Sequence, residues 1–471
     1  MNPDETTTSD SQTSPTSAAV TSKGQPSVSQ YAYNDSVTKA EVLWALQTIA
    51  KHQSYRSCED ARDIFQTMFP DSQIAQKFTL GKTKVAYTVV HGLAPYFQTT
   101  LTDAVNKCDV YVACFDEALN KISQRGQMDI VVRFWDASRN VVSTSYLNST
   151  FLGHATARDL EQKFREGLLS LSDKKILQVS MDGPSVNWKF LDSFRDSRDA
   201  GDRKLIDIGS CGLHVLHGAL QTGHSASGWS INEFLRSIYG LFKDSPARRA
   251  DFTTITGSAL FPKKFCQVRW LENVSVATRA LELLDKVKTY VTDKSGVLPK
   301  TVTCKNIKKA CSDLLLRSKT QFFISVASMV EPFLRKYQTD KPMVPFLYND
   351  LGNFLSCLLK RFVKKEVIAD ADTFSKLMKI SVESTEIWCV YKEVDLGVTA
   401  KTELAQCKVS DREKLEFRME CIKFLSAMSA KILERSPLKY SLVRFASCLA
   451  PASVLKGGTI EEQNFAGLVE T

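Results

Sequence analysis

Two acidic residues follow apolar runs that have the composition of β-strands. Asp116 follows the run 109–115 (DVYVACF), and Asp182 follows the run 175–181 (KILQVSM). A strand that returns through a helix prefers to lie parallel to an earlier strand, and ligands collect at the carboxyl ends of such strands. Paired carboxylates there suit Mg²⁺ or Mn²⁺, and two such ions about 4 Å apart serve phosphodiester cleavage and strand transfer. We therefore predict that Asp116 and Asp182 end neighbouring parallel strands. The alternative is that both are ordinary turn formers or helix caps.

The elements that must position these acids follow from hydrophobic periodicity. The pattern predicts an antiparallel meander, a helix at 155–170, a returning strand, a helix starting at Pro184, a fifth strand and a further helix from Gly212. The order is βββαβαβα. The predicted strands are 109–115, 128–135, 140–146, 175–181 and 204–209.

Several short segments occur in a distinctive order along the chain. They are TKAEVLWAL (38–46), FPDSQIA (69–75), FDEALN (115–120), MDGPSVNW (181–188), CGLHVLHG (211–218), SPARR (245–249) and FCQVRW (265–270). Together they resemble hAT-type (hobo-Activator) transposases and their domesticated, gene-like descendants, over about residues 38 to 450. The resemblance implies a ribonuclease H-like catalytic core.

The resemblance also implies roles for individual residues. Asp116 matches the first metal-binding acid of the family, and Asp182, ahead of Asn187, matches the second. The pair Cys211 and His214 matches a Cys-x-x-His motif. An Arg-Trp step, here Arg269 and Trp270, precedes a long helical insertion in the family.

The predicted fold class is α/β, with a ribonuclease H-like mixed sheet flanked by helices, a large all-α insertion and a small N-terminal helical domain. The all-α insertion is expected because, from about residue 271 on, apolar residues recur at intervals of three and four residues. The predicted domains are a disordered tail (1–30), an N-terminal helical domain (31–107), the core (108–270), the insertion (271–437) and a C-terminal segment truncated relative to the family (438–471).

The chain departs from the family at both ends. The third metal-binding acid of hAT transposases lies in a C-terminal segment that is not found here, and Glu461, Glu462 and Glu470 do not match its surroundings. Residues 1–57 hold one histidine, His52, and no cysteine, so no zinc finger of the family's type is detected. These departures favour a transposase-derived, catalytically inactive protein that binds nucleic acid or acts as a protein scaffold. The alternative is a metal-dependent DNA transposase or nuclease.

Several basic and aromatic residues are candidates for contact with nucleic acid. Trp270 is a candidate for stacking on an unpaired base, or it is a core residue, and Arg269, Lys263 and Lys264 are candidate phosphate contacts. The basic residues within 360–365 form a further candidate face, although a solvated helix face is the favoured interpretation there.

Other residues near the predicted site also have both a functional and a structural interpretation. Cys211 and His214, with His217 one turn on, have the spacing of half a zinc site, but a buried helix start held by hydrogen bonds is favoured. Glu117 and Asp136 lie near the predicted site, although acids at strand ends are usually solvated. Asp136 is preferred over Glu117 as a substitute metal ligand.

Composition limits the class of protein. The chain has 471 residues, 43% of them hydrophobic, a net charge of +9 and a pI of 8.8, which permits contact with DNA without requiring it. Its 12 cysteines are scattered, which indicates a reducing compartment and buried thiols, including Cys304, Cys311, Cys357 and Cys448. No leader or membrane span is apparent, so we expect neither secretion nor membrane contact. A nuclear location and DNA or protein partners are what the resemblance implies.

Overall fold

The computed structural model describes residues 28–198, 203–293, 301–339 and 341–470. These residues form two compact units that divide between Leu101 and Thr102. Most of the predicted disordered tail lies outside the described residues. Residues 28–30, which the sequence assigned to that tail, belong to helix α1 (Val28–Ala50).

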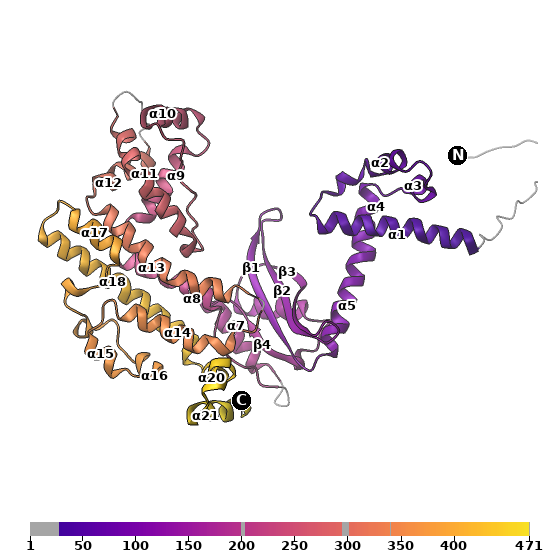
Figure 1. Ribbon diagram of the computed structural model, residues 1–471. Coiled ribbons are helices and arrows are strands. Elements are labelled where there is room, and N and C mark those ends of the chain that lie inside the picture. The colour runs from indigo at the N-terminus through magenta and orange to yellow at the C-terminus, as the bar shows by residue number, and fades with distance from the viewer. Residues whose placement is uncertain (1–27, 199–202, 294–300, 340, 471) are drawn as a thin grey trace, which may run out of the picture. The chain divides into compact units, whose positions relative to one another are not determined.

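The first unit is entirely helical over its described residues (Figure 1). Its core contains Ala45, Phe78, Leu80 and Val85. The buried Glu41 accepts hydrogen bonds from the backbone N–H of Thr79 and from Lys84, which ties the first helix to the segments that follow. The helices are α1 (Val28–Ala50), α2 (Ala61–Met68), α3 (Gln73–Lys77), α4 (Lys82–Tyr87), a π-helical turn (Thr88–Leu93) and α5 (Ala94–Lys107), which continues into the second unit.

The second unit contains one four-stranded mixed sheet with strand order β3-β2-β1-β4. Strands β1 (Tyr111–Asn120), β2 (Arg125–Asp136) and β3 (Val141–Leu152) are antiparallel, and β4 (Ile176–Ser180) pairs with β1 in parallel. The predicted meander and the predicted parallel return are therefore confirmed. Figure 1 shows the sheet with helices packed beside it.

Two predictions about strands are wrong. Strand β1 does not stop before Asp116 but continues to Asn120, because residues 115–120 still pair with β2 in a long hairpin. Residues 204–209 do not form a fifth strand. They approach β4 through a backbone hydrogen bond from Ile206 N to the Leu177 carbonyl oxygen (2.9 Å), and Gly209, at a φ of 87°, then turns the chain away.

Helices α6 (Ala157–Gly167) and α7 (Ser185–Asp196) pack on one face of the sheet. Alternate residues of β1 and β2 are buried, so that Phe115 meets Phe164 and Phe190 edge-on, with ring centroids 5.7 and 5.3 Å away. Pro184 precedes α7 as its N-cap and is not its first helical residue, a shift of one position from the prediction.

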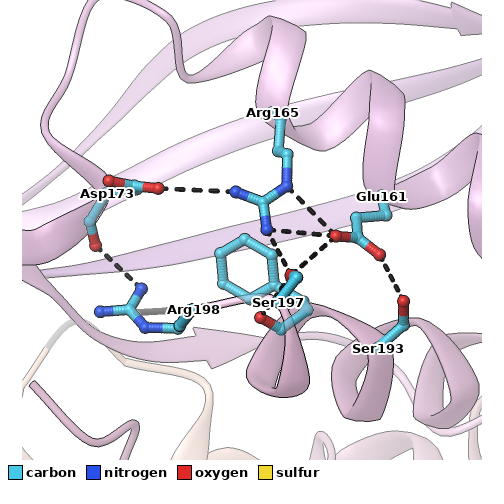
Figure 2. A network of polar contacts seen from close by, with 7 residues as sticks. Glu161, Arg165, Asp173, Ser193, Ser197 and Arg198 are labelled. Atoms are coloured by element: carbon cyan, nitrogen blue, oxygen red, sulfur yellow. Dashed lines mark hydrogen bonds and ion pairs between the residues drawn. The ribbon is translucent and has the colours of Figure 1, made fainter. Parts of the chain in front are cut away.

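A network of polar side chains joins α6 to α7 (Figure 2). Glu161 accepts hydrogen bonds from Nε and Nη2 of Arg165 (3.2 and 3.1 Å) and from the hydroxyls of Ser193 and Ser197. Arg165 also lies over the ring of Phe194, 4.6 Å from its centroid. The network therefore fixes the helix that follows β4 against the helix that precedes it.

The rest of the second unit is helical, and one hydrophobic core runs through it from Leu216 to Leu438. The helices before residue 270 share this core with those after it, so the boundary predicted at 270/271 does not coincide with a break in packing. The helices are α8 (Gly212–Ala226), α9 (Ile231–Phe242), α10 (Pro246–Thr256), α11 (Val274–Thr292), α12 (Val302–Ser312), α13 (Leu316–Tyr337), α14 (Val344–Leu359), α15 (Lys365–Asp370), α16 (Phe374–Leu377), α17 (Val398–Gln406), α18 (Asp411–Arg435), α19 (Ser441–Ala446), α20 (Pro451–Lys456) and α21 (Thr459–Val469).

All 12 cysteines are free, as the sequence predicts. The prediction that they are mostly buried is only partly right, because Cys304 and Cys448 are buried whereas Cys311 is half-buried and Cys357 is exposed on α14. Within the described residues, no helix combines the length and the apolar character that a membrane span requires.

Candidate acidic site

The parallel pairing of β1 with β4 brings Asp116 and Asp182 to the same edge of the sheet. The last parallel pair is Cys114 with Ser180, and each acid lies two residues beyond its member of that pair. Because the two chains run in the same direction, the acids follow at the same level along the strand axis. Their joint placement at this edge agrees with the prediction, although Asp116 lies within its strand and not at its end.

A third carboxylate, Glu117, is the residue after Asp116 in β1. Its side chain points to the opposite face of the strand from that of Asp116. Burial raises the pKa of Glu117, and the charges of Asp182 and Asp116 raise it further. Burial likewise raises the pKa of Asp182, with His214 opposing this rise and Asp116 adding to it. The acids are close enough to repel one another in a partly desolvated setting.

The amide of Asn187, near the start of α7, contacts two of these acids. Asn187 is fully buried, and its Nδ2 donates a 2.6 Å hydrogen bond to Oδ1 of Asp182. A hydrogen bond between Asn187 and Glu117 also limits the rise in the pKa of that carboxyl. The donor end of the amide thus faces the acids, and its own Oδ1 is buried without a hydrogen-bond partner.

A cysteine and histidine pair stands beside the acids at the start of α8. Cys211 is the N-cap residue of α8, and His214 is exposed one turn later. The hydrogen bond with Cys211 raises the pKa of His214, burial opposes this, and the charges of Asp182 and Asp116 add to the rise. Burial alone would raise the pKa of Cys211, but its hydrogen bond with His214 lowers it overall. The hydrogen bond agrees with the helix start favoured by the sequence, but His214 is exposed and not buried.

The loop that carries Asp182 is held by residues from distant parts of the chain. Nη1 of Arg435, the last residue of α18, donates a 2.6 Å hydrogen bond to the carbonyl oxygen of Gly183. A Cβ atom at Gly183 would lie 2.8 Å from Oγ of Ser210, so a larger residue there would displace the Ser210 side chain. The backbone N–H of Cys211 donates to the carbonyl oxygen of Met181 (3.1 Å).

The surroundings of Asp116 and Asp182 bear on whether the pair could hold a metal ion. Over the residues that the structure describes, no group of three or more His, Cys, Asp or Glu side chains is placed to hold a metal ion. One oxygen of Asp182 already accepts a hydrogen bond from the Asn187 amide, and His214 lies close enough to lower the pKa of Asp182. The chain's own donors therefore supply part of the neutralisation that a divalent cation would otherwise provide.

The other carboxylates considered from the sequence lie elsewhere. Asp136 is at the opposite end of β1, because β2 pairs Phe134 with Tyr111 and Asp129 with Asp116. It accepts hydrogen bonds from Ser138 in its own turn, so the preference for Asp136 over Glu117 is wrong. Glu461, Glu462 and Glu470 lie in or directly after α21, which packs on α19.

The predicted nucleic-acid contacts are split between the surface and the core. Trp270 is only 3% exposed, and the centroid of its ring lies 5.0 Å from that of His224 and 5.4 Å from that of Phe265. The prediction that Trp270 stacks on a base is therefore wrong for this conformation. Lys263 and Lys264 are exposed, and Arg269 is exposed and paired with Glu272 at 3.3 Å. The alternative core role for Trp270 is the one that its burial supports.

A pocket of about 560 Å³ lies beside the Arg269–Trp270 step. Its wall includes Lys263 and His217, whose Nδ1 accepts the backbone N–H of Leu271 at 3.2 Å. The arginines that line it are paired with glutamates of their own helices. These pairs are Arg279 with Glu282 (2.8 Å) and Arg335 with Glu331 (2.7 Å). The acidic and basic side chains that line the pocket therefore balance in charge.

Comparison with known proteins adds no family assignment. A scan against models of known protein families gives no match, and a search among curated proteins gives no significant match.

Two residues of the acidic site could not be recognised from the sequence. Glu117 was judged a solvated strand-end acid, whereas it is half-buried within β1. Arg435 had no sequence signal at all, since it lies 252 residues from the glycine that it holds. Only the docking of α18 against the Asp182 loop could identify it.

Proposed function

We propose that this protein is transposase-derived and that its core is a ribonuclease H-like scaffold that binds nucleic acid or protein without cleaving DNA. The observation that carries the proposal is the acidic site itself. Asp116 and Asp182 lie at the same end of the sheet, and an asparagine amide and a histidine lie beside Asp182.

The sheet order supports the ribonuclease H-like interpretation. A meander whose first strand is joined in parallel by the fourth, after one intervening helix, has the strand arrangement expected of that core. The segment 204–209 lies beside β4, where a fifth strand of such a sheet would be. The transposon origin and the nuclear location are proposed from the motif resemblance alone.

A second candidate function is metal-dependent cleavage and strand transfer of DNA. Burial is the largest cause of the raised pKa of Asp182 and of Glu117, and the charge of Asp116 adds to both. It is this second cause that favours a metal, because carboxylates that repel one another gain from a cation between them. Mg²⁺ is often held by only one or two carboxylates, with water and substrate phosphates completing its shell. Asp116 and Asp182 would hold it in that case.

Nicking of supercoiled plasmid in Mn²⁺ separates the two functions. We expect the full chain to give no more nicking than buffer, and the Asp116→Ala and Asp182→Ala variants to match it. Mn²⁺-dependent nicking by the wild type that both variants lose would instead establish the enzyme.

Binding of DNA is tested by fluorescence anisotropy as a function of salt. We expect micromolar or weaker affinity that falls steeply with salt. The triple alanine variant of Lys263, Lys264 and Arg269 should reduce the salt slope by roughly three, because each cation that neutralises a phosphate contributes about one.

A control triple variant removes the same charge from exposed residues at another place in the chain. It carries alanine at Lys401, Lys408 and Arg412. Equal effects of the two triple variants, or no DNA binding at low salt, would direct the scaffold function to protein partners.

A further inference from the structure

Strand β3 forms one edge of the sheet. It pairs with β2 on one side, and within the described part of the chain no strand pairs with its other side. It is 12 residues long. An edge of this length presents a row of backbone N–H and C=O groups that can pair with a further strand.

The sequence of β3 lacks the features that usually protect such an edge. Proteins block edge strands with charged residues, proline or short length, and β3 (VVSTSYLNSTFL) contains neither a charge nor a proline. It exposes apolar surface as well, with Val142 36%, Tyr146 59% and Phe151 41% exposed. This combination is typical of a strand that is paired in the functional state.

A bulge divides β3 into two halves, and each half has side chains on the same two faces of the sheet as the other. Tyr146 lies opposite Val131 and Asn148 opposite Ile130, so Leu147 is the extra residue and is buried. The hydroxyls of Tyr146 and Ser149 are 2.6 Å apart, which places residues from both sides of the bulge on one face. This face, which points away from α6 and α7, is called the open face below.

Paired with an antiparallel second copy of itself, β3 is self-complementary. A register that places Val142 opposite Phe151 also places Thr144 opposite Ser149, and both pairs lie on the open face. On the opposite face the same register places Ser143 opposite Thr150 and Val141 opposite Leu152. In these four pairs apolar residues meet apolar residues, and hydroxyls meet hydroxyls, as stable cross-strand pairs require; Tyr146 and the bulge residue Leu147 lie opposite each other at the two-fold axis.

We propose that the free edge of β3 pairs with β3 of a second copy of this chain, antiparallel and in this register, to form one continuous sheet. A two-fold dimer needs a self-complementary surface, which the sequence of β3 provides, and the absence of charge in β3 removes like-charge repulsion across the axis. The same absence of charge makes this edge a poor surface for a phosphate backbone, whose binding requires cations. The proposal does not depend on the function proposed above.

The test is sedimentation equilibrium of the full chain with two double variants that share one substitution. Both carry Phe151→Glu, and they differ only in Val142→Glu or Val142→Lys, both at exposed positions. In the proposed register residue 142 of each copy faces residue 151 of the other, so the pair occurs twice in the dimer. The variant with Val142→Glu places like charges there, whereas the variant with Val142→Lys places opposite charges.

We expect the wild type and the Val142→Lys/Phe151→Glu variant to dimerise, and the Val142→Glu/Phe151→Glu variant to dimerise at least about tenfold more weakly. Hydrogen exchange of the amides of 141–152 should slow as the wild-type concentration rises. A wild type that stays monomeric, or two variants with the same dimer affinity, would overturn the proposal. Dimerisation without slower exchange in β3 would assign the interface to another surface and would overturn it too.

Discussion

The network in Figure 2 predicts a stability change that depends on pH. Burial alone would raise the pKa of Glu161, but hydrogen bonds from Ser193, Ser197 and Arg165 outweigh burial and lower it overall. A carboxyl whose folded pKa is lowered stabilises the fold fully above its unfolded pKa, about 4.3. That stabilisation is lost as the pH falls through the folded pKa.

The perturbation is Glu161→Gln. The amide keeps one oxygen acceptor, which can still receive Arg165 and Ser197, and its nitrogen can donate to the hydroxyl of Ser193, so no buried group is left without a partner. The variant then loses only the part of the hydrogen-bond free energy that depends on the negative charge of Glu161. The side chain of Glu161 is 16% exposed but that of Arg165 is 36% exposed, so solvent screens the ion pair. We expect a loss of about 1–2 kcal/mol in the free energy of unfolding at pH 7.

The measurement is urea unfolding of the full chain at pH 7 and at pH 4, with Glu166→Gln as the control. Glu166 lies on the same helix and pairs with Lys163, but it is 41% exposed, so its substitution should have little effect. The deficit of Glu161→Gln should shrink at pH 4. A deficit that is equal at both pH values, or equal in the two variants, would refute the assignment of the stability to the Glu161 charge.

Two further predictions concern the candidate residues. Asp182→Asn removes a charge whose pKa is raised by burial and by Asp116, so it should raise the free energy of unfolding at pH 7 in EDTA by about 1 kcal/mol. The gain should vanish below the unfolded pKa of about 3.9. A loss of stability at pH 7 would contradict this prediction. Because the ring of Trp270 is buried, Trp270→Ala should lower the free energy of unfolding by about 3–5 kcal/mol, measured by thermal or urea unfolding. Trp270→Phe should lower it less and leave DNA affinity unchanged. An unaltered unfolding midpoint in Trp270→Ala would restore the base-stacking role.

Local patterns in the sequence determined the type of most elements. The alternation of apolar residues gave the meander β1 to β3, and the apolar run before Asp182 gave β4, because both signals depend on residues that are neighbours in the chain. Handedness and connection rules then placed β4 parallel to β1, so the approach of Asp116 to Asp182 was predictable without coordinates.

Tertiary structure decided what surrounds each residue. A tryptophan before a long helix has the same local pattern whether it is exposed or buried, and only the packing of His224 and Phe265 on Trp270 makes it a core residue. The basic face predicted within 360–365 fails at Arg361 for the same reason, since its guanidinium is buried over Phe322.

The acidic site shows the same division. The sequence by itself determined that two acids meet at one sheet edge, because strand order and direction follow from local patterns and chain connectivity. It could not determine that Glu117 is half-buried or that Arg435 holds the Asp182 loop, because β1 extends only through its pairing with β2 and α18 returns from far along the chain. Burial and long-range hydrogen bonds are properties of the packed chain, and they decide the charge state of the site.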